Sequence, residues 1–167
     1  MIKKVLGSLF FAGAMLVAGN SFAQDQAQKD EQILKEYFAK NGIKATRTPS
    51  GLYYTIKKKG SGDNAKVGQT VTMNYYGKLL DGKRFDSNGI DDNFNPVPMS
   101  PGRTAFSFPL GAHRVIAGWD EAVQLLNKGE QAVIYLPSGI AYGPNGAGGA
   151  IPPNAVLVFD VEVVAIQ

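Results

Sequence analysis

The residue types in this sequence leave few reaction classes for a conventional active site. The chain has 167 residues, no cysteine and a single histidine, His113. The lack of cysteine excludes a thiol nucleophile, an iron–sulfur cluster and a thiolate zinc site, and one histidine excludes a multi-histidine metal centre. The sequence contains no P-loop, no dinucleotide-binding glycine pattern and no nucleophile elbow. We therefore expect no metal and no cofactor.

The residues that stand out as a candidate site are aromatic, with one carboxylate among them. They fall at strand ends, at turns and at a helix start: Tyr75, Phe85, Asp86, Phe106, Trp119, Tyr142 and Phe159. For any one of these rings the simplest interpretation is a place in the hydrophobic core. As a group they favour a pocket, because Asp86 directly follows Phe85 and a buried carboxylate needs partners. Trp119 follows Gly118 at a predicted helix start, where its flat ring would form the floor of a cavity.

Most segments after residue 51 have the composition of β-strands. They are rich in β-branched and aromatic residues, and they cover residues 52–58, 70–79, 104–108, 131–136 and 156–164. In the last segment apolar residues alternate with Asp160 and Glu162, which predicts one covered and one wet sheet face. One internal helix, residues 120–126, would cover the apolar face. The predicted fold class is α+β: a curved antiparallel sheet of five to six strands, a half-barrel, wrapped around one short α-helix.

The first 23 residues have the pattern of a secretory signal peptide. A basic start at Lys3 and Lys4 precedes an apolar run and a small-x-small site that ends at Ala23. A membrane anchor is the alternative, but about 15 apolar residues are fewer than the roughly 20 that span a bilayer. The sequence therefore predicts cleavage after Ala23, export to the periplasm and no stable membrane insertion of the mature chain.

Removal of this leader would make the chain nearly neutral. The full chain has 17 basic and 14 acidic residues, a net charge of +3, and the leader holds two of the lysines and no acid. The mature chain then has a net charge of about +1 and lacks the basic stripe that nucleic-acid binding requires. Lys57, Lys58 and Lys59 form one basic cluster, which a solvated strand end explains. We therefore expect no nucleic-acid partner.

A polar segment, residues 24–48, precedes the predicted strands. Its apolar residues are spaced as one stripe of a short helix that ends near Asn41, namely Ile33, Leu34, Tyr37 and Phe38. A helix of roughly a dozen residues is marginal alone, so it must dock on the domain or fray. It is interpreted as a linker or as a remnant of a dimerising arm, and the linker is favoured. The predicted organisation is a signal peptide (1–23), a helical extension (24–48) and one domain (49–167).

The aromatic residues lie in six motifs that resemble the FKBP-type peptidyl-prolyl cis–trans isomerases. In chain order the motifs are VTMNYYG (71–77), LDGKRFDS (80–87), FSFPLG (106–111), VIAGWDE (115–121), IAYG (140–143) and IPPNAVLVFDVE (151–162). Each motif alone is modest, but six in the family's order are highly specific, and the resemblance covers about residues 49–167. It implies the FKBP half-barrel and an isomerase that rotates X–Pro bonds without covalent chemistry and without a cofactor.

The resemblance also implies roles for the site residues. Phe85, Asp86 and Tyr142 are expected to be catalytic. The expected substrate-binding residues are Tyr75, Phe106, Val115, Ile116, Trp119, Ile151 and Phe159. In the family, the residue at Asp86 faces the carbonyl region of the substrate. The Ile116 N–H and the Tyr142 hydroxyl would donate hydrogen bonds to the bound peptide.

The implied partners are unfolded or proline-containing polypeptides and macrolide-type inhibitors, bound by a monomer. Two departures from the family pattern predict a more open pocket rim: Ala147 stands where some members carry histidine, and Ala150 where many carry a bulky aliphatic residue. The proline-rich loop at 88–103 is also longer than in minimal members, and such loops are usually functional or disordered. The alternative function is a periplasmic holdase that grips unfolded chains through the same apolar cleft with little turnover.

Overall fold

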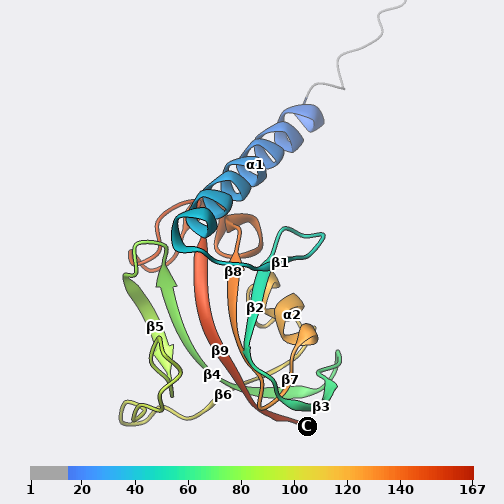
Figure 1. The fold of residues 1–167 in the computed structure, drawn as a ribbon. Helices are drawn as coiled ribbons and strands as arrows, with labels where there is room; N and C mark the ends of the chain where they lie inside the picture. The colour runs from blue at the N-terminus through green and yellow to red at the C-terminus, as the bar shows by residue number, and fades with distance from the viewer. Residues whose placement is uncertain (1–14) are drawn as a thin grey trace, which may run out of the picture.

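The fold is a curved antiparallel sheet with a helix packed on each of its faces (Figure 1). The computed structural model describes residues 15–167, with side chains from residue 23 onward. Most of the predicted signal peptide, residues 1–23, therefore lies outside the described residues. No helix in the described part of the chain is both long enough and apolar enough to cross a membrane.

The main sheet has seven strands, because a two-residue edge strand adds to the five or six expected from the sequence. Its order is β1-β2-β8-β9-β4-β5, with β6 also paired to β4, and every pairing is antiparallel. A separate small sheet pairs β3 with β7. The strands are β1 (Thr46–Arg47), β2 (Tyr53–Lys58), β3 (Ser61–Asn64), β4 (Thr70–Leu79), β5 (Arg84–Asn88), β6 (Phe106–Pro109), β7 (Asn127–Lys128), β8 (Gln131–Leu136) and β9 (Leu157–Ile166).

The long strands bend where their pairing register shifts. On β4 one shift lies between Thr72 and Met73 against β9, and another lies between Gly77 and Lys78 against β5. Such irregularities bend a strand and increase its twist. They allow the sheet to curve around the short internal helix, and the curvature is visible in Figure 1.

The internal helix begins earlier than the sequence predicts. The expected helix at 120–126 is α2 (Ala117–Ala122) followed by a 3-10 turn, η1 (Val123–Leu125). The first turn is fixed by Asp120, whose carboxylate accepts hydrogen bonds from the backbone N–H groups of Gly111 and His113 at 2.9 and 3.1 Å. Two further 3-10 turns follow, η2 (Ser138–Ile140) and η3 (Gly143–Asn145).

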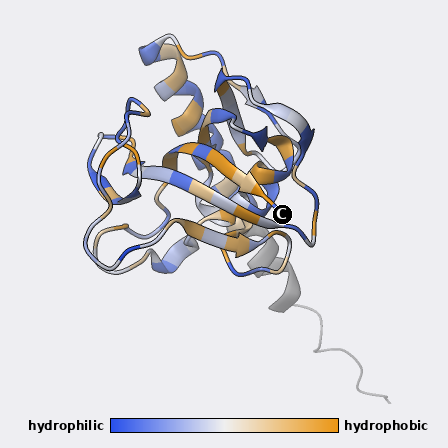
Figure 2. Ribbon diagram, turned by 90° about the horizontal axis from the view of Figure 1, so that it is seen from below, coloured by the Kyte–Doolittle hydropathy of each residue, from blue (hydrophilic) through white to orange (hydrophobic). Residues whose placement is uncertain are grey.

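Two apolar cores lie on opposite faces of the sheet. On β8, Ile134 and Leu136 point into the inner core with α2, whereas Val133 and Tyr135 point into an outer core. Figure 2 shows the apolar stretches gathered on the strands in the middle of the domain, with mostly polar loops around them. The alternation of side chains along each strand therefore supplies both cores.

The prediction of one wet sheet face is wrong over the middle of the sheet. Asp160 on β9 lies on the expected wet face, yet it is buried beside Val158 and pairs with Lys78 Nζ at 2.8 Å. The face is covered because the N-terminal helix, α1 (Met15–Asn41), packs Leu34 and Phe38 against it.

This helix is longer than the dozen residues expected, and it ends at Asn41 as predicted. Its C-terminal half contacts the domain through Asp30, Leu34 and Phe38, among others. Its N-terminal half projects away from the sheet (Figure 1). Ile33 of the predicted apolar stripe stays exposed. The C-terminal half of α1 is thus docked on the outer face of the sheet.

The long proline-rich segment at 88–103 is folded against the domain. Ile90 is buried and forms an isolated bridge with Pro96. Asp91 caps a local turn by accepting hydrogen bonds from the backbone N–H groups of Asn93 and Asn95. Phe94 packs against the outer core. The segment is therefore an ordered excursion from the end of β5.

The docking of α1 gives a testable stability difference. We expect Leu34→Ala to lower the free energy of unfolding by about 2–4 kcal/mol, because it empties a fully buried leucine site. Urea denaturation followed by circular dichroism measures this change. Ile33→Ala on the same helix removes a side chain that is 41% exposed and should change stability by less than about 0.5 kcal/mol. Equal effects of the two substitutions would contradict the docking.

Candidate active site

The floor of the site is the indole ring of Trp119 on α2. The side chain is 4% exposed, and three aromatic rings surround it edge-to-face. The ring centroids of Tyr75, Phe106 and Phe159 lie 5.1, 5.6 and 5.2 Å from that of Trp119. Such T-shaped pairs add attraction beyond the burial of apolar area. The floor is therefore a fixed aromatic surface, and it includes one buried polar group without a partner among the described residues, the indole N–H.

Because Gly77 on β4 has no side chain, the rings of Phe85 and Phe159 can lie directly over its backbone. A Cβ atom there would lie 2.6 Å from the Phe85 ring and 2.8 Å from the Phe159 ring, closer than real contacts allow. The two rings pack edge-to-face with centroids 5.4 Å apart. Glycine at position 77 therefore brings Phe85 of β5 next to the floor residue Phe159 of β9.

These rings line a cavity of about 710 Å³ that opens between the sheet and α2. All ten residues predicted for the site line it: Tyr75, Phe85, Asp86, Phe106, Val115, Ile116, Trp119, Tyr142, Ile151 and Phe159. Ala147 and Ala150, the two small residues expected at the rim, line it as well. The structure thus brings together residues from four strands, one helix and two loops that lie far apart in the sequence.

The carboxylate that lines the cavity, Asp86, lies at the end of a hydrogen-bond network. Its Oδ2 accepts a hydrogen bond from the Tyr75 hydroxyl at 2.6 Å, and its Oδ1 accepts bonds from the Ser87 N–H at 2.8 Å and from Arg103 at 3.2 Å. Burial opposes ionisation, but these donors outweigh it and lower the pKa of Asp86. Burial and the bond to Asp86 raise the pKa of Tyr75. The network therefore holds Asp86 as a carboxylate and Tyr75 as a neutral phenol.

Two residues of the cavity lining, Tyr142 and Ile116, carry hydrogen-bond donors without an acceptor among the described residues. Tyr142, between η2 and η3, is 39% exposed, and burial together with the charge of Asp86 raises the pKa of its hydroxyl. Ile116 immediately precedes α2, and its carbonyl accepts bonds from Trp119 N–H and Asp120 N–H. Its own N–H has no acceptor among the described residues. Both groups can therefore donate to a ligand in the cavity.

Comparisons with known proteins agree with this geometry. Residues 62–164 match the family model described as FKBP-type peptidyl-prolyl cis-trans isomerase. The chain belongs to this family. The α+β fold with its curved antiparallel sheet is that of solved FKBP structures.

Two relatives and one solved structure show how far the similarity extends. The probable FKBP-type isomerase FkpA of Neisseria meningitidis serogroup B is 45% identical over 86% of this chain and 47% of its own length. The outer membrane protein MIP of Legionella longbeachae is 34% identical over 89% of this chain and 57% of its own. The crystal structure of a peptidyl-prolyl isomerase from Pseudomonas syringae pv. tomato superposes with a TM-score of 0.65 and 27% identity, covering 84% of this chain and 96% of that one. The chain spans about half the length of the FkpA relatives that it matches, those of Neisseria meningitidis and of Aeromonas hydrophila.

Sequence reasoning missed three polar residues at this FKBP-type cavity. Arg103, at the far end of the 88–103 segment, binds Asp86 and the Ser87 carbonyl, and His113 and Arg114 line the rim. Arg103 lies 17 residues from its carboxylate partner, so no local spacing signals the pair. His113 lies two residues before the motif that begins at Val115, and this proximity is the one sequence signal that could have placed it at the cavity.

The Asp86 network gives a prediction in acid. We expect the pKa of Asp86 to lie below its usual value of 3.8, because three donors outweigh the cost of burial. A lowered native pKa means that ionised Asp86 stabilises the fold above the unfolded-state value and that this contribution is lost as the pH falls through the native value. Carbon-13 NMR titration of the carboxyl groups measures the shift.

The control for this titration uses two tyrosines of the same strand. Tyr75→Phe removes the 2.6 Å hydrogen bond and should raise the pKa of Asp86, whereas Tyr76→Phe, on the opposite face of β4, should leave it unchanged. A native Asp86 pKa at or above 3.8 would contradict the network.

Proposed function

We propose that this chain catalyses cis–trans isomerisation of X–Pro bonds in polypeptides. The observation that carries the proposal is the cavity floor, where Trp119 lies among Tyr75, Phe106 and Phe159 and can receive a small apolar ring. Membership of the isomerase family supports the same activity. The reaction breaks no covalent bond, which agrees with a lining that contains no thiol, serine or lysine.

The barrier to this reaction is electronic. Resonance keeps the amide planar, and rotation costs roughly 18–20 kcal/mol. Uncatalysed X–Pro rotation therefore takes tens to hundreds of seconds, which is slow enough to limit folding. Tens of events per second require the barrier to fall by about 4–5 kcal/mol, at 1.36 kcal/mol for each tenfold. The proposed site must supply that much preference for the twisted amide.

The proposed mechanism is tighter binding of the twisted amide than of either planar form. The aromatic walls, with Phe85 at one side, take the pyrrolidine ring out of water. A planar amide separates charge and is stabilised by water, so a water-poor site penalises the planar state more than the twisted one. This preference alone lowers the barrier without any proton transfer.

Three polar groups fix the peptide in this proposal. The Tyr142 hydroxyl and the Ile116 N–H donate hydrogen bonds to the peptide backbone, and Asp86 interacts with the displaced carbonyl region or orients its neighbours. Asp86 stays ionised through Tyr75 and Arg103, and it need not transfer a proton. The small side chains of Ala147 and Ala150 in the lining would leave room for the substrate residues that flank the proline.

The proposed substrates are unfolded, exported polypeptides. The basic start, apolar run and small-residue site that end at Ala23 support export to the periplasm. Exported chains fold after translocation, when their X–Pro bonds are isomeric mixtures. The protein would act there as a monomer without a cofactor, and macrolide-type ligands of the family would compete with the peptide. No nucleic-acid partner is proposed, because the chain without its leader would carry a net charge of about +1.

We expect Phe85→Ala and Asp86→Ala each to lower kcat/KM for a prolyl peptide by about tenfold or more, because each removes a group that contacts the twisted amide. A protease-free isomerisation assay measures the change. Phe94→Leu and Asp63→Asn are matched controls outside the cavity and should retain wild-type turnover. Unchanged turnover in the two cavity variants would refute their assignment.

An aggregation-suppression assay run beside the first one tests the holdase. The observation that favours this alternative is a pair of large apolar side chains, Val97 and Met99, that are exposed on the 88–103 segment. Suppression of aggregation by a wild-type chain that shows no turnover would replace the isomerase with the holdase.

Export has its own test. We expect the chain purified from the periplasm to begin at Gln24, because cleavage after Ala23 follows from the three-part leader pattern. Intact-mass measurement of the periplasmic and cytoplasmic fractions shows this directly. Ala23→Arg should block processing, while Ala27→Arg, four residues beyond the site, should leave it intact. An intact N-terminus in the periplasm would contradict cleavage.

A further inference from the structure

We infer that α1 supports the cavity from outside, and that its residue Asp30 is a positioning residue that holds Tyr142 in place. The inference rests on the proposed isomerase function, because it takes the Tyr142 hydroxyl as a donor to the peptide. It goes beyond that function by assigning a catalytic consequence to a helix that contributes no residue to the cavity lining.

The contact between Asp30 and Ser138 is buried and joins residues 108 positions apart. The Oδ2 atom of Asp30 accepts hydrogen bonds from the Ser138 N–H at 2.7 Å and from the Ser138 hydroxyl at 2.6 Å. Its Oδ1 atom accepts a third bond from Gln26 at 2.7 Å. Asp30 is 0% exposed and Ser138 1%. A carboxylate removed from water in this way is held strongly only while its donors stay in place.

Ser138 is the first residue of η2, and η2 leads directly to Tyr142. The turn is closed by the Ala141 N–H, which donates to the Ser138 carbonyl at 3.0 Å, and Tyr142 is the next residue. On its other side η2 packs against α2, since a Cβ atom on Gly118 would lie 3.1 Å from the Ile140 carbonyl oxygen. The turn is therefore held between α1 and α2, and Asp30 is its hydrogen-bonded anchor on the α1 side.

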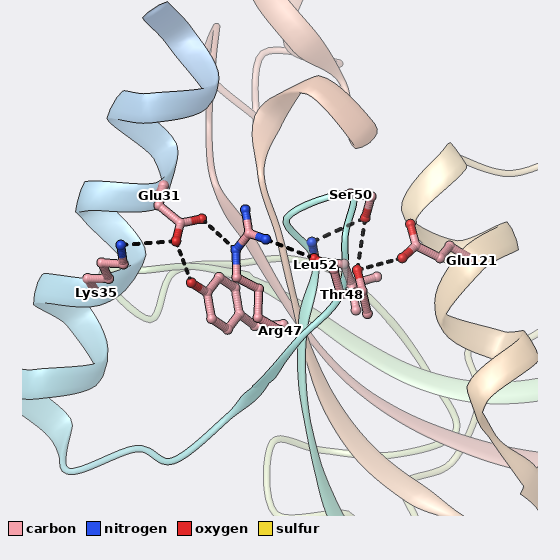
Figure 3. Close-up of polar contacts among 8 residues, drawn as sticks. Glu31, Lys35, Arg47, Thr48, Ser50, Leu52 and Glu121 are labelled. Carbon is pink, nitrogen blue, oxygen red and sulfur yellow. Dashed lines mark hydrogen bonds and ion pairs between the residues drawn. The ribbon is translucent and has the colours of Figure 1, made fainter. Parts of the chain in front are cut away.

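A second polar chain from α1 runs along the surface (Figure 3). Glu31 accepts a bond from Arg47, Arg47 donates to the Thr48 carbonyl, and the Thr48 hydroxyl donates to Glu121 of α2. The Arg47 side chain is 46% exposed, and solvent-exposed ion pairs contribute little. We therefore assign the positioning effect to buried Asp30, and Glu31, its neighbour on the helix, becomes the matched control.

The experiment is a double-mutant cycle in the full chain. We compare kcat/KM for a prolyl peptide in wild type, Asp30→Ala, Tyr142→Phe and the double variant. Asp30→Ala should lower kcat/KM by about tenfold, the value of one lost substrate hydrogen bond, and Tyr142→Phe by a similar factor. The double variant should be no slower than the slower single variant. A merely structural loss would instead multiply with the effect of Tyr142→Phe.

Conservative variants separate positioning from folding. Asp30→Asn keeps an acceptor oxygen and should recover most of the activity lost in Asp30→Ala. Glu31→Gln should stay within about twofold of wild type. If Asp30→Ala does not fold, as judged by Trp119 fluorescence, Ser138→Ala takes its place. That variant removes only the hydroxyl donor, and it should lower kcat/KM about threefold in the wild-type background and not at all in Tyr142→Phe.

Three results would overturn the inference: a folded Asp30→Ala variant with wild-type kcat/KM, losses that multiply in the double variant, or a loss in Glu31→Gln as large as that in Asp30→Ala. Absence of turnover in the wild-type chain would overturn the proposed function instead. The two failures are therefore distinct.

Discussion

The packing of aromatic rings around Trp119 is the constraint on which the rest of this structure depends. Four ring centroids, from Tyr75, Phe106, Phe108 and Phe159, lie between 5.1 and 6.1 Å from that of the indole. They come from three strands, so the rings meet only if the sheet curves around α2. The bulges that bend β4 and the missing side chain at Gly77 both serve this meeting. The cavity is thus the exposed end of the inner core, so the close packing of that core also holds the cavity rings in place.

The outer face of the sheet carries the second organising feature. There the docked half of α1 buries Leu34 and Phe38, and the Lys78–Asp160 pair lies beside this contact with Asp160 almost fully covered. Burial raises the pKa of Asp160 although the nearby lysine opposes the change. Since both faces of β8 and of the first half of β9 are covered, these two strands support the loops at their ends, including the turn that leads to Tyr142.

The sequence predicted the principal strands and the aromatic cavity, but it did not predict the packing on the outer face of the sheet. Alternation and turn residues identify the principal strands, and the six motifs identify ten of the residues that line the cavity, because strand period and motif order are local signals. The packing of α1 on the outer face could not be predicted, since alternating polarity marks a sheet face as solvent-exposed whether or not a distant helix packs on it. Arg103 and Asp30 were missed for the same reason: their partners, Asp86 and Ser138, lie far along the chain.

Hydrogen bonds join the two ends of the ordered segment between β5 and β6. Arg103 reaches back to the Asp86 carboxylate and the Ser87 carbonyl, while Asn88 bonds the Thr104 carbonyl, so the two ends of the segment are cross-braced. The stretch at 97–102 beyond them is exposed. Its length and composition can therefore drift in evolution, or be exchanged by grafting, without disturbing the cavity wall. The fold thus offers a position for insertions beside the aromatic cavity.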